Sequence, residues 1–312
     1  MRRNDDSFLD WGASCSTPPT ATDIVVGGLL AGEIGVLLNF ASYGRAWLSM
    51  SMAAAVAGCL PIAPGKAKSA IAAPKSSGRV LLARAYDTVE YTHRSIFLFS
   101  HWLRQQQAPG ALALPKNFDP KNIGQNLMVS ALRVPQPLVV PGTKHDEWGM
   151  GPAETWLRRA TDGVRLTILD PVWHDFNEQD PAPMAALVNV LFHISNKTGT
   201  AFLVTHQATS PLSPGLALLA ERASWVISLH PMSPKAAAHF NISCETERHR
   251  WIRLVETKGL PATRTDCWLY LDAKRALVYA NPAVGADPAN QPQLPGSPSV
   301  QPSSRVPGPF RS

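Results

Sequence analysis

The sequence predicts an α/β protein with a mostly parallel sheet flanked by helices and an antiparallel extension near its C-terminal end. Short, almost wholly apolar runs bounded by polar turns recur along the chain, as expected for strands that a parallel sheet buries on both faces. Helix-like segments separate these runs, and this alternation predicts layers joined by right-handed crossovers. Strand-like runs then dominate the last part before the tail.

The predicted strands of the parallel part share an apolar composition and polar boundaries. They are residues 35–38, 80–83, 166–170 and 201–205. Helices are predicted over residues 46–58, 88–106 and 182–197. The last helix has the clearest pattern, because its apolar residues follow the i, i+3, i+4, i+7 spacing of one helix face. These residues are Leu187, Val190, Leu191 and Ile194.

Three strand-like runs follow the parallel part. They are WVISLH, RHRWIRLVETKG and CWLYLDAKRALVY, the last with a turn at residues 272–275. We interpret all three as an antiparallel extension of the sheet.

The chain divides into three parts. Residues 1–22 are predicted to be a flexible N-terminal segment, residues 23–280 one folded domain, and residues 281–312 a disordered, proline-rich tail. The tail holds eight of the 28 prolines and buries too little apolar surface to offset the entropy cost of ordering. It suits a solubilising tail or, alternatively, a polyproline docking segment. Residues 61–77 are predicted to be a flexible connection inside the domain.

The bulk composition is that of a globular protein. Apolar residues make up 45% of the chain, and the net charge is +6 with a pI near 9.3. This excess permits an acidic partner such as DNA but does not require one. The longest apolar stretch, residues 24–41, is interrupted by Glu33 and falls short of the roughly 20 apolar residues that a membrane span needs. We therefore expect a cytoplasmic protein with no membrane span.

The cysteines and histidines predict no metal site. The four cysteines form no C-x-x-C pair, as is usual in a reducing compartment. His239, Cys244 and His249 are close in sequence, but zinc takes about four ligands and no fourth has a suitable spacing. The signatures of serine hydrolases, dinucleotide-binding folds and zinc proteases are also absent from the sequence.

Four stretches follow one another with the layout of nucleotide-binding motifs. The stretch LLAGEIGVLLNFASYGRAWLSMSMAAAVAGC has the order strand, phosphate loop, helix. GRVLLARAYD is a second strand that ends in a polar residue, and DGVRLTILDPVWHD is an apolar strand closing on an acid, as in a Walker B motif. TGTAFLVTHQATS is a strand that ends at His206. This ordered set resembles the RecA-fold P-loop ATPases over residues 24–272, and within them the RepA-type hexameric replicative helicases of mobilisable plasmids.

The resemblance implies a RecA-like P-loop domain over residues 23–280. It also implies ATP-driven translocation on single-stranded DNA by a ring of subunits, with magnesium-bound ATP between neighbours. The partners that it implies are further copies of this chain or related RecA-fold subunits, together with DNA.

The predicted phosphate loop, residues 39–46, departs from the family pattern where the chemistry takes place. Gly44 matches, but Arg45 replaces the lysine that pairs with the β- and γ-phosphates, and Ala46 replaces the Ser or Thr that binds magnesium. A guanidinium is planar and larger than an ammonium, and Ala46 offers magnesium no oxygen. Phe40 and Tyr43 add bulk where backbone amides would curl around phosphate.

Two further catalytic positions are altered. The family's catalytic Glu corresponds to Tyr86, and a phenol with a pKa near 10 is a poor general base at pH 7. Asp87 is a candidate substitute but is one residue out of register. The Arg that would complete a neighbour's site corresponds to Pro214, with Arg222 nearby as a candidate for compensation.

Three residues match family positions. Asp170 stands at the Walker B acid, which holds magnesium through water, although an Asp at a strand end also caps turns. His206 matches a residue that senses the γ-phosphate or contacts DNA, with a hydrogen-bonded strand-end histidine as the alternative. Lys258 matches a lysine that reaches a neighbour's nucleotide, or it is a solvated turn residue.

We therefore predict a degenerate RecA-like ATPase that lacks efficient hydrolysis and acts as an interaction, regulatory or assembly subunit. Its partner would be itself, a related RecA-fold subunit or another protein. No cofactor is predicted, although ATP and magnesium stay open. The nucleotide-site remnants are Gly44, Arg45, Ala46, Asp170 and Lys258, and the catalytic remnants are Asp87, Asp170 and His206. The alternative is an active ATP-dependent DNA helicase in plasmid or mobile-element replication, in which Arg45, Asp170 and Asp87 act together on Mg–ATP.

Overall fold

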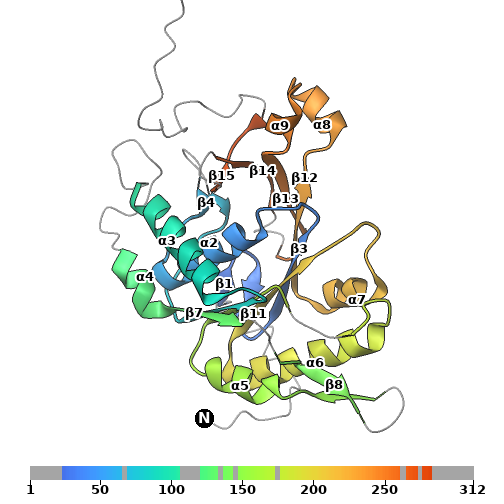
Figure 1. The fold of residues 1–312 in the computed structure, drawn as a ribbon. Helices are drawn as coiled ribbons and strands as arrows, with labels where there is room; N and C mark the ends of the chain where they lie inside the picture. The colour runs from blue at the N-terminus through green and yellow to red at the C-terminus, as the bar shows by residue number, and fades with distance from the viewer. Residues whose placement is uncertain are drawn as a thin grey trace, which may run out of the picture.

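The computed structural model describes residues 23–64, 69–105, 120–132, 136–142, 147–172, 176–260, 265–272 and 276–282 (Figure 1). The predicted flexible segment 1–22 and residues 283–312 of the predicted tail lie outside these ranges. The division of the chain into three parts therefore stays a prediction. Within the described residues, no helix is both long and apolar enough to cross a membrane.

A nine-stranded sheet forms the centre of the molecule, in the order β15-β14-β13-β12-β3-β11-β10-β6-β7. Its first six strands along the chain are β3 (Ile34–Asn39), β6 (Val80–Ala85), β7 (Leu127–Leu132), β10 (Leu166–Asp170), β11 (Ala201–Gln207) and β12 (Trp225–Pro231). These six strands run parallel to one another. They are followed by β13 (Trp251–Lys258), β14 (Asp266–Leu271) and β15 (Leu277–Tyr279), which pair antiparallel. The predicted fold class is confirmed.

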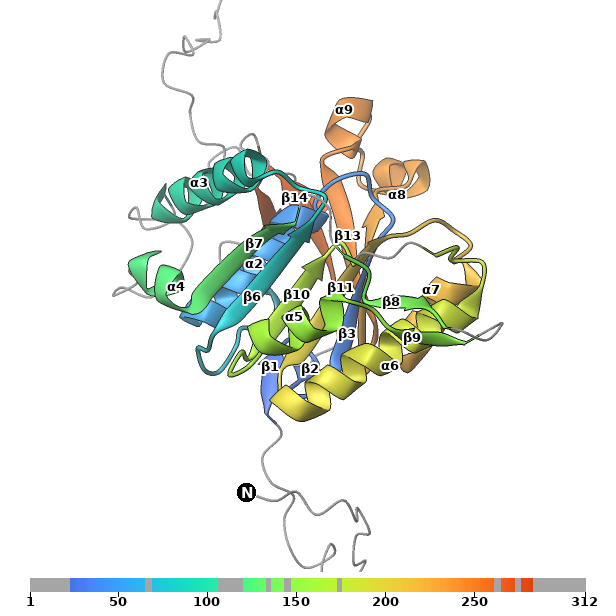
Figure 2. The ribbon, with the colours of Figure 1, turned by 60° about the horizontal axis from the view of Figure 1, so that its bottom comes forward.

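Helices cover both faces of the sheet (Figure 2). One face carries α2 (Arg45–Gly58), α3 (Val89–Gln105) and α4 (Pro120–Asn126). The other carries α5 (Ala153–Ala160), α6 (Pro181–Thr198) and α7 (Pro214–Arg222). Successive strand residues feed opposite faces, so Leu37 of β3 packs on the α2 side and Val36 on the α6 side. Two short helices, α8 (Pro234–His239) and α9 (Glu245–Arg248), lie between β12 and β13.

Local sequence signals explain where the helices begin and end. At the start of α6, the Asp180 side chain accepts a hydrogen bond from the Ala182 backbone at 2.9 Å, which satisfies one of the free amides of a helix N-terminus. Gly199 ends the same helix with φ 75°, a conformation that glycine adopts without strain. The middle of α2 is buried on all sides, because the helix lies between the sheet and α4 and has an apolar, small-residue sequence.

Two predictions about local structure were wrong. The run WVISLH, now β12, is parallel to β3 and antiparallel only to β13, so the antiparallel extension begins one strand later than expected. The stretch predicted as a flexible connection, residues 61–77, contains β4 (Ile62–Pro64) and β5 (Ser69–Ile71), which form an antiparallel pair. Part of the predicted turn at residues 272–275 lies outside the described residues.

Several elements had no clear sequence signal. Among the strands, the longest of these is the edge strand β7, whose six residues are all half-buried. Two small antiparallel pairs were also not predicted. They are β1 (Ile24–Val26) with β2 (Leu29–Leu30), and β8 (Val139–Pro141) with β9 (Trp148–Met150).

Candidate functional site

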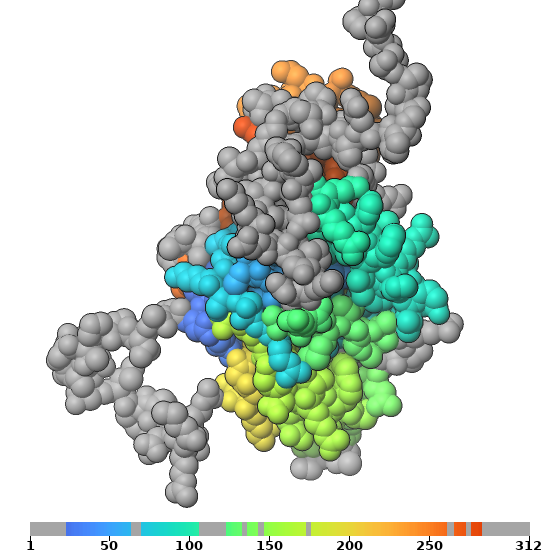
Figure 3. Space-filling view, turned by 90° about the vertical axis from the view of Figure 1, so that its left-hand side faces the viewer, coloured from blue at the N-terminus to red at the C-terminus, as the bar shows by residue number. Residues whose placement is uncertain are grey.

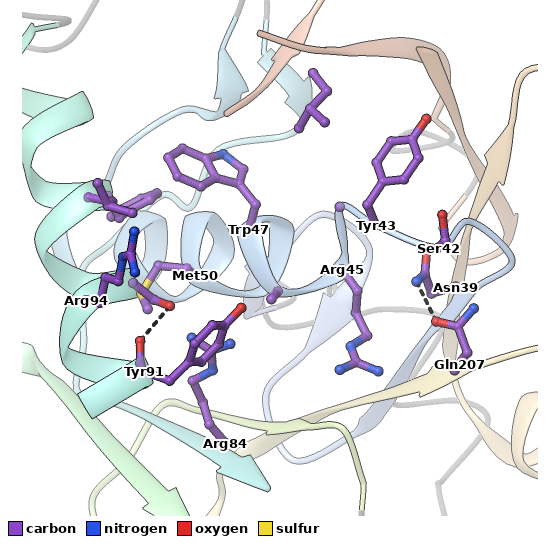
Figure 4. A pocket seen from close by; sticks show the side chains of 16 residues that line it. Asn39, Ser42, Tyr43, Arg45, Trp47, Met50, Arg84, Tyr91, Arg94 and Gln207 are labelled. Atoms are coloured by element: carbon purple, nitrogen blue, oxygen red, sulfur yellow. Dashed lines mark hydrogen bonds between the residues drawn. The ribbon is translucent and has the colours of Figure 1, made fainter. Parts of the chain in front are cut away.

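The loop between β3 and α2 lies at the carboxyl ends of the parallel strands and is braced from two of them. Asn39 Nδ2, at the end of β3, donates to Ala41 O at 2.6 Å and to Gln207 Oε1 at 2.8 Å. Gln207 Nε2, at the end of β11, donates to the same Ala41 oxygen at 3.1 Å. Figure 4 shows Asn39 and Gln207 joined beside the loop. The loop is therefore held against the sheet by two side chains that come from the ends of β3 and β11.

Gly44 is the residue at which the loop becomes helix. Its φ is 96°, and no side chain caps the start of α2. A Cβ at this position would lie 2.8 Å from Ile252 Cδ1 and 3.1 Å from Leu277 Cδ1. Both the backbone angle and the close approach of β13 and β15 require glycine here.

Arg45 and Asp170 form an ion pair across the predicted phosphate site. Arg45 Nε lies 2.9 Å from Asp170 Oδ1, and Thr205 Oγ1 donates to the same oxygen at 2.8 Å. The Asp170 side chain is only 1% exposed, compared with 24% for Arg45. The second carboxylate oxygen, Oδ2, is buried without a hydrogen-bond partner among the described residues. The buried carboxylate of Asp170 is thus paired with Arg45, the residue predicted at the position of the phosphate-binding lysine.

A second ion pair lies beside the first. Arg84 Nε, in β6, lies 2.8 Å from Asp87 Oδ2 just beyond the strand. Burial raises the pKa of Asp87, the Arg84 charge lowers it, and Asp170 and Arg45 act on it in opposite directions. Two arginines and two aspartates therefore form one cluster with balanced charge. Tyr86 adopts φ 65° between the strand and Asp87, and its side chain is exposed.

His206 is not brought to this cluster. Side chains alternate between the faces of a strand, so Thr205 and Gln207 lie on the α2 side while His206 lies on the opposite side. His206 Nε2 is 2.7 Å from Glu178 Oε1, and Nδ1 is 2.6 Å from the Gln207 backbone oxygen. Ser213 Oγ, at the start of α7, donates to the other oxygen of Glu178 at 3.3 Å. His206 thus forms part of a polar contact between β11, α7 and the segment before α6.

Lys258 and Arg222 lie at the opposite end of the strands from the loop, where the parallel strands begin. Because β13 runs antiparallel, its last residue, Lys258, pairs with Val226 near the start of β12. Lys258 Nζ donates to the Glu221 backbone oxygen at 2.6 Å, next to Arg222 at the end of α7. Pro214 is the first residue of α7 rather than part of a loop. Within one chain these residues do not approach the Arg45–Asp170 pair.

A pocket of about 820 Å³ opens beside the N-terminus of α2, between α2 and α3. Arg45, Arg84 and Arg94 come to it from α2, β6 and α3 (Figure 4). Its apolar and aromatic lining includes Tyr43, Trp47, Met50, Tyr91, Leu98 and Phe99. No Asp or Glu is among the described lining residues.

Arg84, Arg94 and Tyr91 were not predicted as members of this site. Arg84 carried a usable signal, since a charged residue inside the apolar run VLLARA is rarely buried without a partner. Arg94 and Tyr91 had none, because exposed helix residues of this kind are common.

Comparison with known proteins gives distant structural similarities. No family model matches the chain. The RadB recombinase aligns at 9% identity over 81% of this chain and 93% of that chain, with a TM-score of 0.47. The KaiC-like protein PH0186 of Pyrococcus horikoshii OT3 aligns at 10% identity over 82% and 94%, with a TM-score of 0.46. The flagellar accessory protein FlaH of Methanocaldococcus jannaschii aligns at 10% identity over 82% and 92%, also at 0.46.

At such identities, and with TM-scores below 0.5, these likenesses carry no argument about this chain. The chemistry of the site therefore has to be argued from its own residues.

The residues present do not fit a magnesium ion bound with a nucleoside triphosphate. Magnesium prefers oxygen ligands in octahedral geometry, and Ala46 supplies no oxygen where a hydroxyl would stand. Asp170 Oδ1 already contacts Arg45 and Thr205, so among the described residues only its Oδ2 is without a partner. The described residues contain no group of three or more His, Cys, Asp or Glu that could hold a metal ion.

Proposed function

We propose that this chain keeps a RecA-like ATPase fold, lacks efficient ATP hydrolysis, and acts through binding, as an interaction, regulatory or assembly subunit. The observation that carries the proposal is the ion pair between Arg45 and the buried Asp170. A phosphate-bound magnesium would require Asp170 to face the metal, but this pair presents its Oδ1 to a fixed cation of the same chain.

The energetic argument supports a large loss of rate. Removing one preorganised electrostatic group from an active site costs about 10² to 10³ in rate. Here Arg45, Ala46 and Tyr86 stand at three such positions. In addition, Arg84 and Asp87 form an ion pair with each other. Such groups act as a unit, so the losses need not add. Each of them alone is expected to lower the rate of hydrolysis by about 10² to 10³.

The alternative, an active helicase, has one observation in its favour. The pocket carries three arginines and no described acid, which suits phosphate. Turnover would further require Arg45 to leave Asp170 and a metal to take its place. We therefore expect that any nucleotide bound here does not depend on magnesium and is not hydrolysed.

A nucleotide assay on the purified full-length chain tests this proposal. We would measure phosphate release from ATP, with and without single-stranded DNA, together with binding of a fluorescent ATP analogue with and without Mg²⁺. The expected result is no hydrolysis above background and no effect of Mg²⁺ on binding. Magnesium-dependent hydrolysis that Asp170→Asn abolishes would overturn the proposal.

Two variants sharpen the assay. In Arg45→Lys/Ala46→Thr, the residues of a working phosphate loop are restored, and magnesium-dependent nucleotide binding is expected to appear. Arg104→Ala, on the exposed end of α3, is the matched control and should behave like the wild type. If the restored variant gains nothing, the loop geometry rather than these two residues prevents binding.

A further inference from the structure

The pocket beside α2 offers positive charge to a ligand. Arg45 and Arg84 are each held by an aspartate. Arg94, on the exposed side of α3, has no ion-pair partner in the described part of the chain. Guanidinium groups bind carboxylates strongly through paired hydrogen bonds. A ligand with carboxylates would therefore find one available guanidinium and two more close to it.

Large exposed apolar side chains lie on α3 and in the turn that precedes it. Each is between 51% and 68% exposed, and α3 forms part of the molecular surface on this side (Figure 3). This set, named here the α3 patch, consists of Tyr86, Val89, Tyr91, Phe97 and Leu98. Tyr91 and Leu98 also line the pocket. Clustered exposed apolar surface marks interaction sites, and because this patch extends beyond the pocket it suits a polypeptide better than a small anion.

One segment of the chain outside the described residues has the complementary composition. Residues 4–11 read NDDSFLDW and combine three aspartates with three large apolar side chains. The other long stretches outside the structure, residues 106–119 and 283–312, hold a single acidic residue each, Asp119 and Asp287. Charge and apolar content together single out residues 4–11 as a match for the pocket and the α3 patch.

The connection is long enough for this segment to reach the pocket of its own chain. The described part begins at Asp23, which pairs with Arg165 just before β10, while the pocket lies near the other end of that five-residue strand. Such a strand is about 17 Å long. The residues between Trp11 and Asp23 span at most about 40 Å when fully extended.

We propose that the pocket and the α3 patch bind residues 4–11 of the same chain. The aspartates would pair with the arginines, and the aromatic side chains would cover the exposed part of α3. An intramolecular segment has an effective concentration near millimolar, so a modest affinity is sufficient. This inference goes beyond the proposed function, and because its test contains no nucleotide, either can fail without the other.

A competition experiment tests the contact in the full-length chain. A fluorescein-labelled peptide of residues 4–14, which begins after Arg2 and Arg3, is titrated by fluorescence anisotropy at low salt. The wild type is compared with Asp5→Asn/Asp6→Asn/Asp10→Asn, whose own segment no longer competes. The triple variant should bind the peptide at least about tenfold more tightly than the wild type. Equal affinity for the two proteins would overturn the proposal.

Substitutions on α3 locate the contact. In the triple variant, Arg94→Glu should weaken peptide binding at least about tenfold, because it places like charges together. Arg104→Glu, on the same helix but outside the pocket lining, should have little effect. Equal losses with the two variants would exclude the pocket as the binding site.

Two further measurements distinguish this contact from binding of a second copy of the chain and from binding of phosphate. If wild-type protein binds the peptide better on dilution, the segment comes from a second copy and the intramolecular contact is wrong. Inorganic phosphate should displace the peptide no better than chloride at the same ionic strength. Specific displacement by phosphate at low concentration would identify a phosphate site instead.

Discussion

At the scale of single residues, the most informative feature is how Asp170 is satisfied. A carboxylate with a side chain 1% exposed is costly unless it is paired and hydrogen-bonded. Arg45 and Thr205 supply that environment within the chain. These contacts account for Oδ1, whereas Oδ2 has no hydrogen-bond partner among the described residues.

The Arg45–Asp170 pair yields a stability prediction. Arg45→Ala leaves the Asp170 carboxylate without its cation and should lower the free energy of unfolding by about 1 to 3 kcal/mol. In a double-mutant cycle with Asp170→Asn, the coupling should lie between about 0.5 and 3 kcal/mol. Urea unfolding of the four proteins measures it. Arg104→Ala is the control, and additive effects would show that the pair is not a stabilising contact.

His230 yields a prediction about pH. It stacks on Phe40 with ring centroids 4.7 Å apart, and Nε2 lies 2.8 Å from Ser228 Oγ. Burial, and to a smaller extent Arg253, lowers the pKa of His230 below its ordinary 6.5. The unfolded chain then binds this proton first as the pH falls, so the native state loses stability below about pH 6.5.

Urea unfolding between about pH 7.5 and pH 5.5 checks this expectation. His230→Gln should make stability depend less on pH across this window than it does in the wild type. His93→Gln, an exposed histidine of α3, should leave the dependence unchanged. An identical pH dependence in His230→Gln and the wild type would contradict the prediction.

At the scale of elements, the start of α2 depends on one glycine. Gly44→Ala requires an L-residue at φ 96° and places a Cβ 2.8 Å from Ile252 Cδ1. Strained backbone of this kind costs about 1 to 3 kcal/mol, and the contact adds to it. Gly124→Ala in α4, where a Cβ would meet open space, is the control and should be neutral or stabilising by up to about 1 kcal/mol. Thermal unfolding distinguishes the two, and equal effects would contradict the loop geometry.

At the scale of the whole molecule, one continuous sheet joins the parallel part to the antiparallel extension. Two apolar clusters cover its faces, and both draw on strands from the centre of the sheet. The antiparallel strands share the α2-side cluster through Ile252, Leu254 and Leu269. We expect the described strands to unfold together rather than as two separate units.

Hydrogen exchange of the native protein tests this expectation. The central strands β3 and β11 should exchange most slowly, because they are hydrogen-bonded on both sides and buried on both faces. The edge strands β7 and β15 should exchange fastest within the sheet. If β13, β14 and β15 exchanged as a separate fast unit, the extension would be an independently unfolding part of the molecule.

Much of this arrangement can be predicted from the sequence because it follows local rules. The buried strands of the parallel part and the helices α2, α3 and α6 follow from apolar runs and helical periodicity, which depend only on neighbouring residues. The predicted departures from the phosphate-loop and catalytic positions, at Arg45, Ala46 and Tyr86, likewise rest on residue identities alone. Edge strand β7 was not predicted, since its half-buried residues carry no strong pattern.

The tertiary structure alone decided which distant residues meet. Strand order brought Arg45 to Asp170 and Arg84 beside them, and no local pattern encodes a pairing between separate strands. The alternation of side chains places His206 on the α6 face of the sheet. Because β13 is antiparallel to β12, Lys258 lies where the parallel strands begin, away from the loop. The residue types, the strands of the central sheet other than β7, and the helices α2, α3 and α6 follow from the sequence, whereas the site depends on sheet order and strand direction. These are properties of long-range packing, so they cannot be read from one segment at a time.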